Sequence, residues 1–319
     1  MKKIVFYDNN LTLRGTSIAL YNYADYNEKI LGNKSIIIAK PDDFINLAKD
    51  KFTKRFETHF MWYNASGFQN FMNQNSVDYF YVIKEGSMGD GILLTETPTL
   101  VHSVFCKNEP HGHRYAYVSD WLAKNQGYNP ETHSVPHMVE KLPETNKNLR
   151  EELGIPNNKT VFGYYGGSTE FNIEFVRETV CRIAKERDDI VFLFMNINKF
   201  CEDLPNIIHL PGTWDLEEKA SFVRACDGMI HARKYGETFG LACGEFALEN
   251  KPIITYFGSG ERNHIDVLGE RGLYYNNVEE LYDILTNFQS HIKYDDYDLP
   301  YKQFSPEIIM DKFNKIFLS

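Results

Sequence analysis

The sequence predicts an α/β protein with two domains, each built on a parallel sheet that helices cover on both faces. Three observations support this prediction. Short apolar segments alternate with segments of helical periodicity along the chain, which is typical of parallel sheets. The alternation restarts after a polar stretch near the middle. The length of 319 residues also exceeds the usual size of one domain.

Six short apolar runs in the first half predict strands: Ile4–Tyr7, Ser35–Ala39, Val77–Ile83, Thr99–Phe105, Tyr115–Val118 and Val135–Val139. Between several of them lie predicted helices: Thr16–Ile30, Pro41–Lys49, Ser66–Asn73 and Trp121–Gln126. The segment Glu140–Asn148 is polar and contains Pro143, so we expect it to link the two domains.

The second half repeats this pattern with predicted strands at Val161–Tyr165, Ile190–Asn196, Ile207–Leu210, Gly228–Ala232 and Pro252–Tyr256. A helix follows the first of them, because four apolar residues recur at spacings of one helical face: Ile173, Val176, Val180 and Ile183. Asp215 and Glu218 have the spacing of a capping box and open the next helix. Three more helices are predicted: Gly240–Asn250, Glu279–Asn287 and Glu307–Phe317.

These elements predict two Rossmann-like domains with parallel sheets facing a central cleft. We expect these domains to comprise residues 1–145 and 146–304, with the C-terminal helix 305–319 packing back onto the first domain. The net charge of −10 argues against a nucleic-acid-binding protein. No apolar run is long enough for a membrane span or a signal peptide, and the five cysteines form no CxxC pair. We therefore expect a cytoplasmic protein with reduced thiols.

The segment Arg233–Glu245 is the main candidate for a ligand site. A helix is expected to begin near Phe239, where free N–H groups and a partial positive charge suit a pyrophosphate. Gly240 would let a ligand approach the backbone closely. Glu237 precedes this helix and Glu245 lies within it, so one carboxylate could bind a transferred hexose and the other a ribose.

Two glutamates at this spacing also occur by chance, and Glu245 could be a solvated helix residue. However, its neighbours Leu241, Ala242, Phe246 and Ala247 are apolar, which predicts a buried helix on which a charge needs a partner or a ligand.

The block Glu237-x7-Glu245, followed by Lys251-Pro252-Ile253-Ile254-Thr255, resembles the E-x7-E signature of retaining GT-B glycosyltransferases of family 4. Further segments resemble the same family: His209–Gly212, Glu217–Asp227, Gly258–Glu261 and Gly272–Tyr274. The resemblance covers most of residues 155–290.

The resemblance implies a GT-B architecture and a metal-independent, retaining hexosyltransferase that needs no cofactor. Its co-substrate would be a UDP-, GDP- or ADP-linked sugar, and its acceptor a glycan or another hydroxyl compound. Residues 1–145 would bind the acceptor and residues 146–304 the nucleotide-sugar donor. Glu237 would contact the transferred sugar in a catalytic role, and Glu245 the ribose. The sugar and phosphates would meet the backbone of Thr238, Phe239, Gly240 and Leu241.

The loop Gly166-Gly167-Ser168 resembles the family's glycine loop, whose backbone N–H groups meet the diphosphate. The sequence departs from the family after this loop, because Glu170 and Glu174 stand where Arg and Lys are usual. Arg233, Lys234 or Arg14 would then supply the positive charge that the diphosphate needs.

On the acceptor side, the loop of Arg14, Gly15 and Thr16 resembles the glycine-containing loop near the start of family members. Thr16 or Ser17 could also cap the following helix. His102 ends a predicted strand and resembles the family's catalytic histidine, which faces the donor sugar, although a lone histidine at a strand end is often structural.

Two other functions remain open: a non-catalytic GT-B protein that binds nucleotide sugars or glycans, and a GT-B sugar-nucleotide epimerase. A dehydrogenase is disfavoured, because no G-x-G-x-x-G follows the first strand of either half. Asp296-Tyr297-Asp298 matches the D-x-D metal motif but lies outside any strand–loop–helix site, so we expect no metal there.

Overall fold

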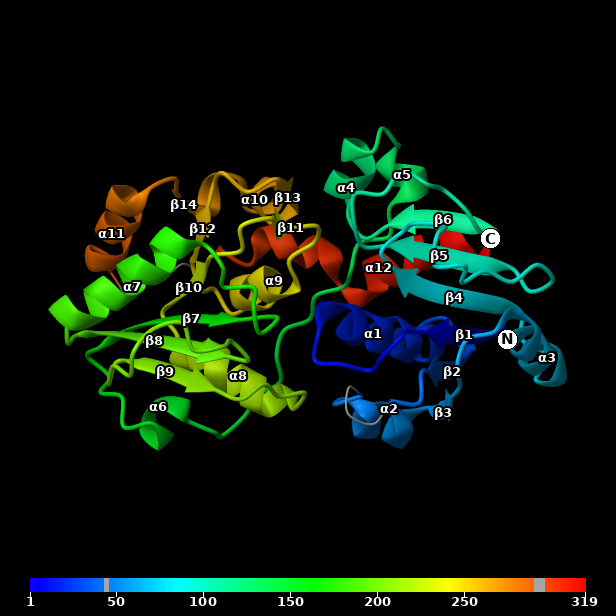
Figure 1. Ribbon diagram of the computed structural model, residues 1–319, viewed down its shortest axis with the longest axis horizontal. Coiled ribbons are helices and arrows are strands. Elements are labelled where there is room, and N and C mark those ends of the chain that lie inside the picture. Colours follow the sequence, from blue (N-terminus) through cyan, green and yellow to red (C-terminus); the bar gives the residue numbers. More distant parts are fainter. Residues whose placement is uncertain (43–45, 290–295) are drawn as a thin grey trace. The chain divides into compact units, whose positions relative to one another are not determined.

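The computed structural model describes residues 1–42, 46–289 and 296–319, and its two parallel six-stranded sheets with helices confirm the predicted α/β fold (Figure 1). These residues form two compact units. Unit 1 comprises Met1–Met138 and Phe304–Ser319, and unit 2 comprises Val139–Gln303. Within the described ranges, no helix is long and apolar enough to cross a membrane.

The sheet of unit 1 has the strand order β3-β2-β1-β4-β5-β6, all parallel. Its strands are β1 (Lys3–Tyr7), β2 (Lys34–Ala39), β3 (Glu57–Phe60), β4 (Tyr79–Lys84), β5 (Thr99–Ser103) and β6 (Arg114–Tyr117). The central strands are almost continuously buried, as expected for a parallel sheet covered on both faces.

Helices flank this sheet (Figure 1): α1 (Gly15–Lys29), α2 (Lys49–Arg55), α3 (Ala65–Gln74), α4 (Asp120–Asn125), α5 (Pro130–His133) and α12 (Pro306–Phe313). The chain enters α12 from the 3₁₀ segment η2 (Leu299–Phe304) and leaves it through the π-helical turn η3 (Asn314–Leu318). The ring of Phe313 lies 6.4 Å from that of Phe6 and 5.6 Å from that of Tyr81. The C-terminal residues therefore belong to the core of unit 1.

The sheet of unit 2 has the order β14-β12-β10-β7-β8-β9, again parallel. Its strands are β7 (Thr160–Tyr165), β8 (Ile190–Met195), β9 (Ile207–Leu210), β10 (Gly228–His231), β12 (Ile253–Tyr256) and β14 (Leu273–Tyr275). The chain runs outward from β7 through β8 to β9 and then crosses back to place β10 on the other side of β7. The strand order therefore reverses between β7 and β10. Ligands bind beside such a switch point in open α/β sheets.

The helices of unit 2 are α6 (Leu149–Glu152), α7 (Glu174–Glu186), α8 (Leu216–Ala225), α9 (Leu241–Leu248), α10 (Asn263–Leu268) and α11 (Val278–Thr286), with the 3₁₀ turn η1 (Gly269–Arg271). The predicted apolar face of α7 is buried, including Val176, Val180 and Ile183. Asp215 caps α8 by accepting from the backbone N–H groups of Glu217 and Glu218. The backbone N–H of Asp215 itself donates to Thr213 Oγ1, at 3.0 Å.

Three local predictions differ from the structure. The segment Val135–Val139 is not a regular strand: the backbone N–H groups of Val135 and His137 donate to the carbonyl oxygens of Tyr117 and Val118, and Ser134 forms an isolated bridge to Tyr117. The predicted helix Pro41–Lys49 includes residues 43–45, which lie outside the described residues, and the observed helix α2 begins at Lys49. The edge strand β3 was not predicted.

Candidate functional site

The candidate site lies in unit 2, at the carboxyl edge of its sheet. Loops that begin at the ends of β7 and β10 meet there, and they carry Glu170 and Arg233. A two-stranded parallel ribbon, β11 (Gly236–Glu237) with β13 (Glu261–Arg262), adjoins them. The expected loop before α9 is thus partly a strand. Gly236 has φ of 84°, and a Cβ there would overlap the carbonyl oxygen of Glu261, so only glycine fits this position.

The carboxylate of Glu237 is held at both oxygens. Arg233 Nη1 donates to Oε2 at 2.9 Å, and Nε2 of the fully buried His231 lies 3.2 Å from Oε1. Burial acts to raise the pKa of Glu237, but the hydrogen bond from His231 and the charge of Arg233 outweigh it and lower this pKa to about 2. Glu237 is therefore ionised at neutral pH, with each oxygen able to accept one further hydrogen bond.

Arg233 also pairs with Glu170, whose Oε2 accepts from Arg233 Nε at 2.7 Å. This contact explains how the chain accommodates an acid directly after its glycine loop. Burial opposes the charge of Arg233, but Glu237 and Glu170 raise its pKa above the ordinary value. Lys234, in contrast, is exposed, and its backbone N–H donates to Asn172 Oδ1. Of the two cations predicted within Arg233–Glu245, Lys234 is therefore the more exposed.

Helix α9 begins one turn after Glu237. Gly240 is its N-cap and takes a left-handed conformation with φ of 94°, which favours glycine. Thr238 and Phe239 are buried, and the carbonyl oxygen of Phe239 accepts from Asn263 Nδ2 at 2.7 Å. Leu241 is the first helical residue and is half-buried. The predicted helix N-terminus is therefore present and anchored from α10.

Glu245 lies about one turn into α9 and is buried, as its apolar neighbours predict. Lys219 Nζ, from α8, lies 2.8 Å from Oε1 and 3.1 Å from Oε2 of this carboxylate, and the hydroxyl of Tyr165 donates to Oε2. Lys219 is itself 5% exposed. Nothing in the sequence around Glu245 indicates these two partners, because they come from α8 and from the end of β7.

The loop Gly166-Gly167-Ser168 follows β7 and is tied to the loop after β8. Asn196 Nδ2 donates to the carbonyl oxygen of Gly166 at 2.7 Å, and the backbone N–H of Asn198 donates to that of Ser168 at 2.9 Å. A Cβ on Gly167 would lie 2.9 Å from Cγ of Glu170. The loop thus presents its backbone at the same sheet edge as Arg233.

His102 in unit 1 is a core residue. Its side chain is fully buried, Nε2 donates to the carbonyl oxygen of Val135 at 2.8 Å, and the Tyr81 hydroxyl lies 2.6 Å from Nδ1. Burial lowers its pKa to about 3, so the ring is neutral. This enclosed ring differs from the ligand-facing catalytic histidine that the resemblance implies, since both of its nitrogens already serve the packing of unit 1.

The loop of Arg14, Gly15 and Thr16 follows β1 in unit 1. Arg14 is the N-cap of α1, and neither Thr16 nor Ser17 caps this helix through its side chain. The hydroxyl of Ser17 instead donates to the buried Asp8, at 2.8 Å from Oδ2. Arg14 and Gly15 are exposed and Thr16 is half-exposed, so this loop is accessible on unit 1.

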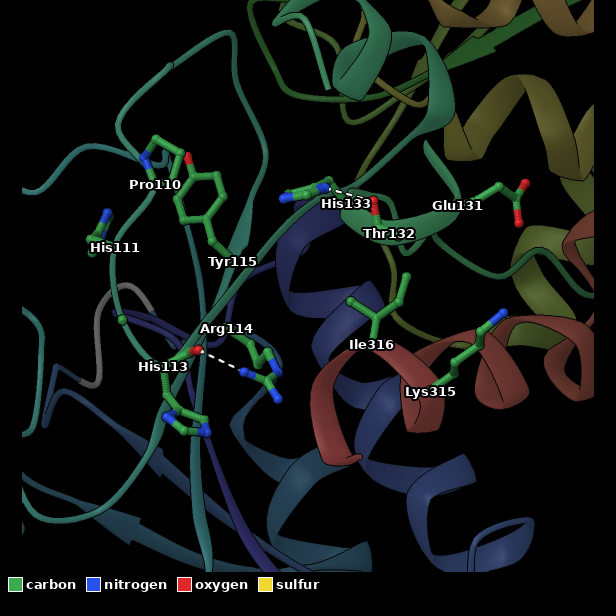
Figure 2. Close-up of a pocket in the computed structure, with 11 residues that line it drawn as sticks. Pro110, His111, His113, Arg114, Tyr115, Glu131, Thr132, His133, Lys315 and Ile316 are labelled. Carbon is green, nitrogen blue, oxygen red and sulfur yellow. Dashed lines mark hydrogen bonds between the residues drawn. The ribbon is translucent and has the colours of Figure 1, made fainter. Parts of the chain in front are cut away.

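A cavity of about 420 Å³ lies elsewhere in unit 1, lined by residues 110–115, 131–133 and 315–316 (Figure 2). Arg114 and Lys315 reach it from β6 and from the C-terminal turn, and His133 reaches it from α5. It lies at the amino end of β6, opposite the sheet edge at which ligands bind in such folds. None of the predicted site residues lines it.

Comparisons with known proteins identify the fold. No protein-family model matches the sequence, and no curated protein matches it. Solved structures do match over their whole length. The Anabaena protein HepE with UDP and glucose has a TM-score of 0.75 at 14% identity, covering 100% of both chains. A glycosyltransferase from Rickettsia africae has a TM-score of 0.69 at 16% identity, covering 99% of this chain and 97% of the other.

Sucrose-phosphate synthase from Thermosynechococcus elongatus has a TM-score of 0.72 at 12% identity, covering 100% of this chain and 98% of the other. These three matches span both six-stranded sheets of this chain. At these identities the similarity establishes architecture. The chain therefore has the two-domain, Rossmann-like GT-B fold of glycosyltransferases.

Proposed function

We propose that this protein is a glycosyltransferase that moves a sugar from a nucleoside-diphosphate sugar to a hydroxyl group of a glycan or small acceptor. The observation that carries the proposal is the position of two carboxylates around the N-terminus of α9. Glu237 lies just before this terminus and Glu245 lies about one turn inside the helix, at the carboxyl edge of a GT-B sheet.

The chemistry of this arrangement suits a nucleotide sugar. The free N–H groups at the start of α9 and the backbone of Gly166–Ser168 are donors for a diphosphate. Glu237 is ionised, so its oxygens can accept hydrogen bonds from sugar hydroxyls. Glu245 would accept from the ribose after exchanging part of its contact with Lys219.

We propose retention of configuration without a metal ion. The acceptor would attack the face that the diphosphate leaves, and the departing phosphate would take the acceptor's proton. Arg233, Lys234 and the helix terminus would stabilise the charge that develops on the leaving group. Glu237 would orient the sugar ring in its oxocarbenium-like transition state.

The proposal is tested by turnover. The purified chain is incubated with UDP-, GDP- and ADP-linked sugars, with and without hydroxyl acceptors, and release of nucleoside diphosphate is measured. UDP-glucose is the first donor to test, because HepE has been solved with UDP-glucose. We expect release with at least one donor, and loss of it in Glu237→Gln by a factor on the order of 100.

Glu279→Gln is the matched control, because Glu279 is an exposed acid of α11 in the same unit. Binding of a nucleotide sugar without turnover would contradict the proposal in favour of a non-catalytic binding protein. Conversion of the donor's sugar without acceptor would favour an epimerase. Turnover in Glu237→Gln equal to that of the control would exclude the proposed role of Glu237.

A further inference from the structure

Three buried side chains form a series of hydrogen bonds that connects Glu237 to α10. His231 Nε2 is 3.2 Å from Glu237 Oε1, and His231 Nδ1 is 2.9 Å from the Thr255 hydroxyl. The same hydroxyl is 3.0 Å from His264 Nε2. All three side chains have no exposed surface. We call His231, Thr255 and His264 the buried chain.

Each contact in the buried chain needs one donor and one acceptor, so the protons can be assigned along it. A carboxylate accepts only, and therefore Nε2 of His231 carries a proton and donates to Glu237. If His231 is neutral, its Nδ1 is an acceptor, and the Thr255 hydroxyl must donate to it. Thr255 oxygen then accepts from Nε2–H of His264. Both histidines are Nε2–H tautomers in this arrangement.

The far end of the buried chain, at His264, favours this assignment of the protons. His264 Nδ1 is buried and has no hydrogen-bond partner among the described residues. In the assigned arrangement this atom is an unpaired acceptor. In the opposite arrangement His231 would be an imidazolium, Thr255 would donate to His264, and Nδ1 of His264 would carry an unpaired buried N–H. Orphaned buried N–H groups are rarer than under-satisfied acceptors.

The charges around the buried chain agree with neutral rings. Arg233 already supplies a cation to Glu237, 2.9 Å from Oε2. The rings of His231 and His264 have centroids 4.7 Å apart. Burial first, and then repulsion from any charge on His231, lower the pKa of His264 well below its ordinary value. His264 is therefore neutral, as the assigned tautomer requires.

We propose that Thr255 and His264 are positioning residues that set the Nε2–H tautomer of His231 and thereby hold the Glu237 carboxylate in the orientation that the donor sugar requires. The assignment of the tautomers follows from the contacts alone, whereas the effect on binding of the donor sugar rests on the proposed function. Without the hydroxyl of Thr255, the Nδ1–H tautomer of His231 becomes accessible. Its Nε2 lone pair would then face Glu237 Oε1, leaving Arg233 as the one protein donor identified on the carboxylate.

The tautomers are measured directly by two-bond ¹H–¹⁵N correlation spectra of the full chain with ¹⁵N-labelled histidine, assigned with His231→Gln and His264→Gln. We expect both residues to be Nε2–H tautomers in the unmodified protein. An Nδ1–H tautomer or an imidazolium at either residue in the unmodified protein would overturn the proposal.

A matched pair of variants tests the role of the hydroxyl. Thr255→Val keeps the shape and removes the hydroxyl, and Thr255→Ser restores it. In Thr255→Val we expect population of the Nδ1–H tautomer at His231 and a fall in kcat on the order of tenfold to a hundredfold, the cost of a hydrogen bond to a charged group. KM for the donor should change by less than about twofold, because ribose and diphosphate contacts remain. Thr255→Ser should resemble the unmodified protein in spectrum and rate.

The two claims fail separately. If no nucleotide sugar turns over in the unmodified protein, the proposed function fails while the spectra still decide the tautomers. If the unmodified protein turns over and Thr255→Val keeps its Nε2–H tautomer and full kcat, the positioning role of Thr255 is wrong. Should Thr255→Val not fold, the spectrum of the unmodified protein and the rate of Thr255→Ser still decide, since an unrescued Ser variant contradicts the hydroxyl's role.

Discussion

Lys219 Nζ lies 2.8 Å from Glu245 Oε1, and both residues are buried inside unit 2. Removing one partner of such a pair leaves an uncompensated buried charge. We expect Lys219→Met to destabilise unit 2 by about 3–5 kcal/mol, measured by urea unfolding. The exposed pair of Lys185 and Glu202 gives the control, since Lys185→Met should leave the unfolding midpoint almost unchanged. Equal unfolding midpoints for the two variants would contradict a structural role for Lys219.

The proposed ribose contact of Glu245 predicts a binding effect. Glu245→Gln keeps the shape but weakens an acceptor for ribose hydroxyls. We expect the Kd for the nucleoside diphosphate to rise on the order of tenfold, measured by calorimetry. Glu249→Gln is the control, because Glu249 lies at the end of α9 and pairs with Arg224. An unchanged Kd in Glu245→Gln would refute the ribose contact.

The buried Asp8 of unit 1 predicts a dependence of stability on pH. Burial raises its pKa from 3.8 to about 6, although the Ser17 hydroxyl acts to lower it. Because the folded pKa is raised, the contribution of Asp8 to stability is full below pH 3.8 and is lost as the pH rises through about 6. Asp8→Asn should therefore stabilise unit 1 at pH 7.5 by as much as about 3 kcal/mol.

This advantage of Asp8→Asn should shrink between pH 6 and pH 4, in urea unfolding followed at each pH. Asp78→Asn is a control for a carboxylate of the same unit, since Asp78 Oδ2 accepts from the backbone N–H of Lys3 at an exposed site. A constant difference between Asp8→Asn and the unmodified protein across this range would show that Asp8 does not titrate differently on folding.

Gly236 predicts a local effect next to the site. Gly236→Ala requires both a left-handed backbone and room that the Glu261 carbonyl occupies, so the pairing of β11 with β13 should break. Gly269→Ala is the matched control, with φ of 53° and nothing within 4 Å of the new Cβ. We expect about 1 kcal/mol of destabilisation in the control. Gly236→Ala should be destabilised by more than the control and should also lose turnover. Equal destabilisation of the two variants would contradict the steric constraint at Gly236.

Much of the fold could be predicted from the sequence because parallel sheets bury their strands on both faces, which makes the apolar runs of β1, β7 and β8 stand out. The segment Val135–Val139 has such an apolar run and runs beside β6 with two backbone hydrogen bonds, but it forms no regular ladder, which the apolar pattern alone does not reveal. The edge strand β3 has no such run, since its residues are exposed or half-exposed.

The candidate site was predictable in part. The glycine loop follows a strand end, and Glu237 and Glu245 lie on either side of the start of α9; local sequence defines both positions. The partners of these residues could not be predicted. Lys219 comes from α8, Tyr165 from β7 and Glu170 from the loop after β7, and the packing of these elements brings them to the site. For His102, the sequence indicated a position in a strand but not the orientation of the ring, which faces inward toward Tyr81.

Binding of a nucleotide sugar by unit 2 at α9 is tested by a crystal structure of the chain soaked with UDP-glucose. We expect a diphosphate at the backbone of Gly167 and Gly240, ribose hydroxyls within about 3.2 Å of Glu245 and sugar hydroxyls within about 3.2 Å of Glu237. A nucleotide bound away from α9, for example in the cavity beside Arg114, with both carboxylates still in their present contacts, would contradict it.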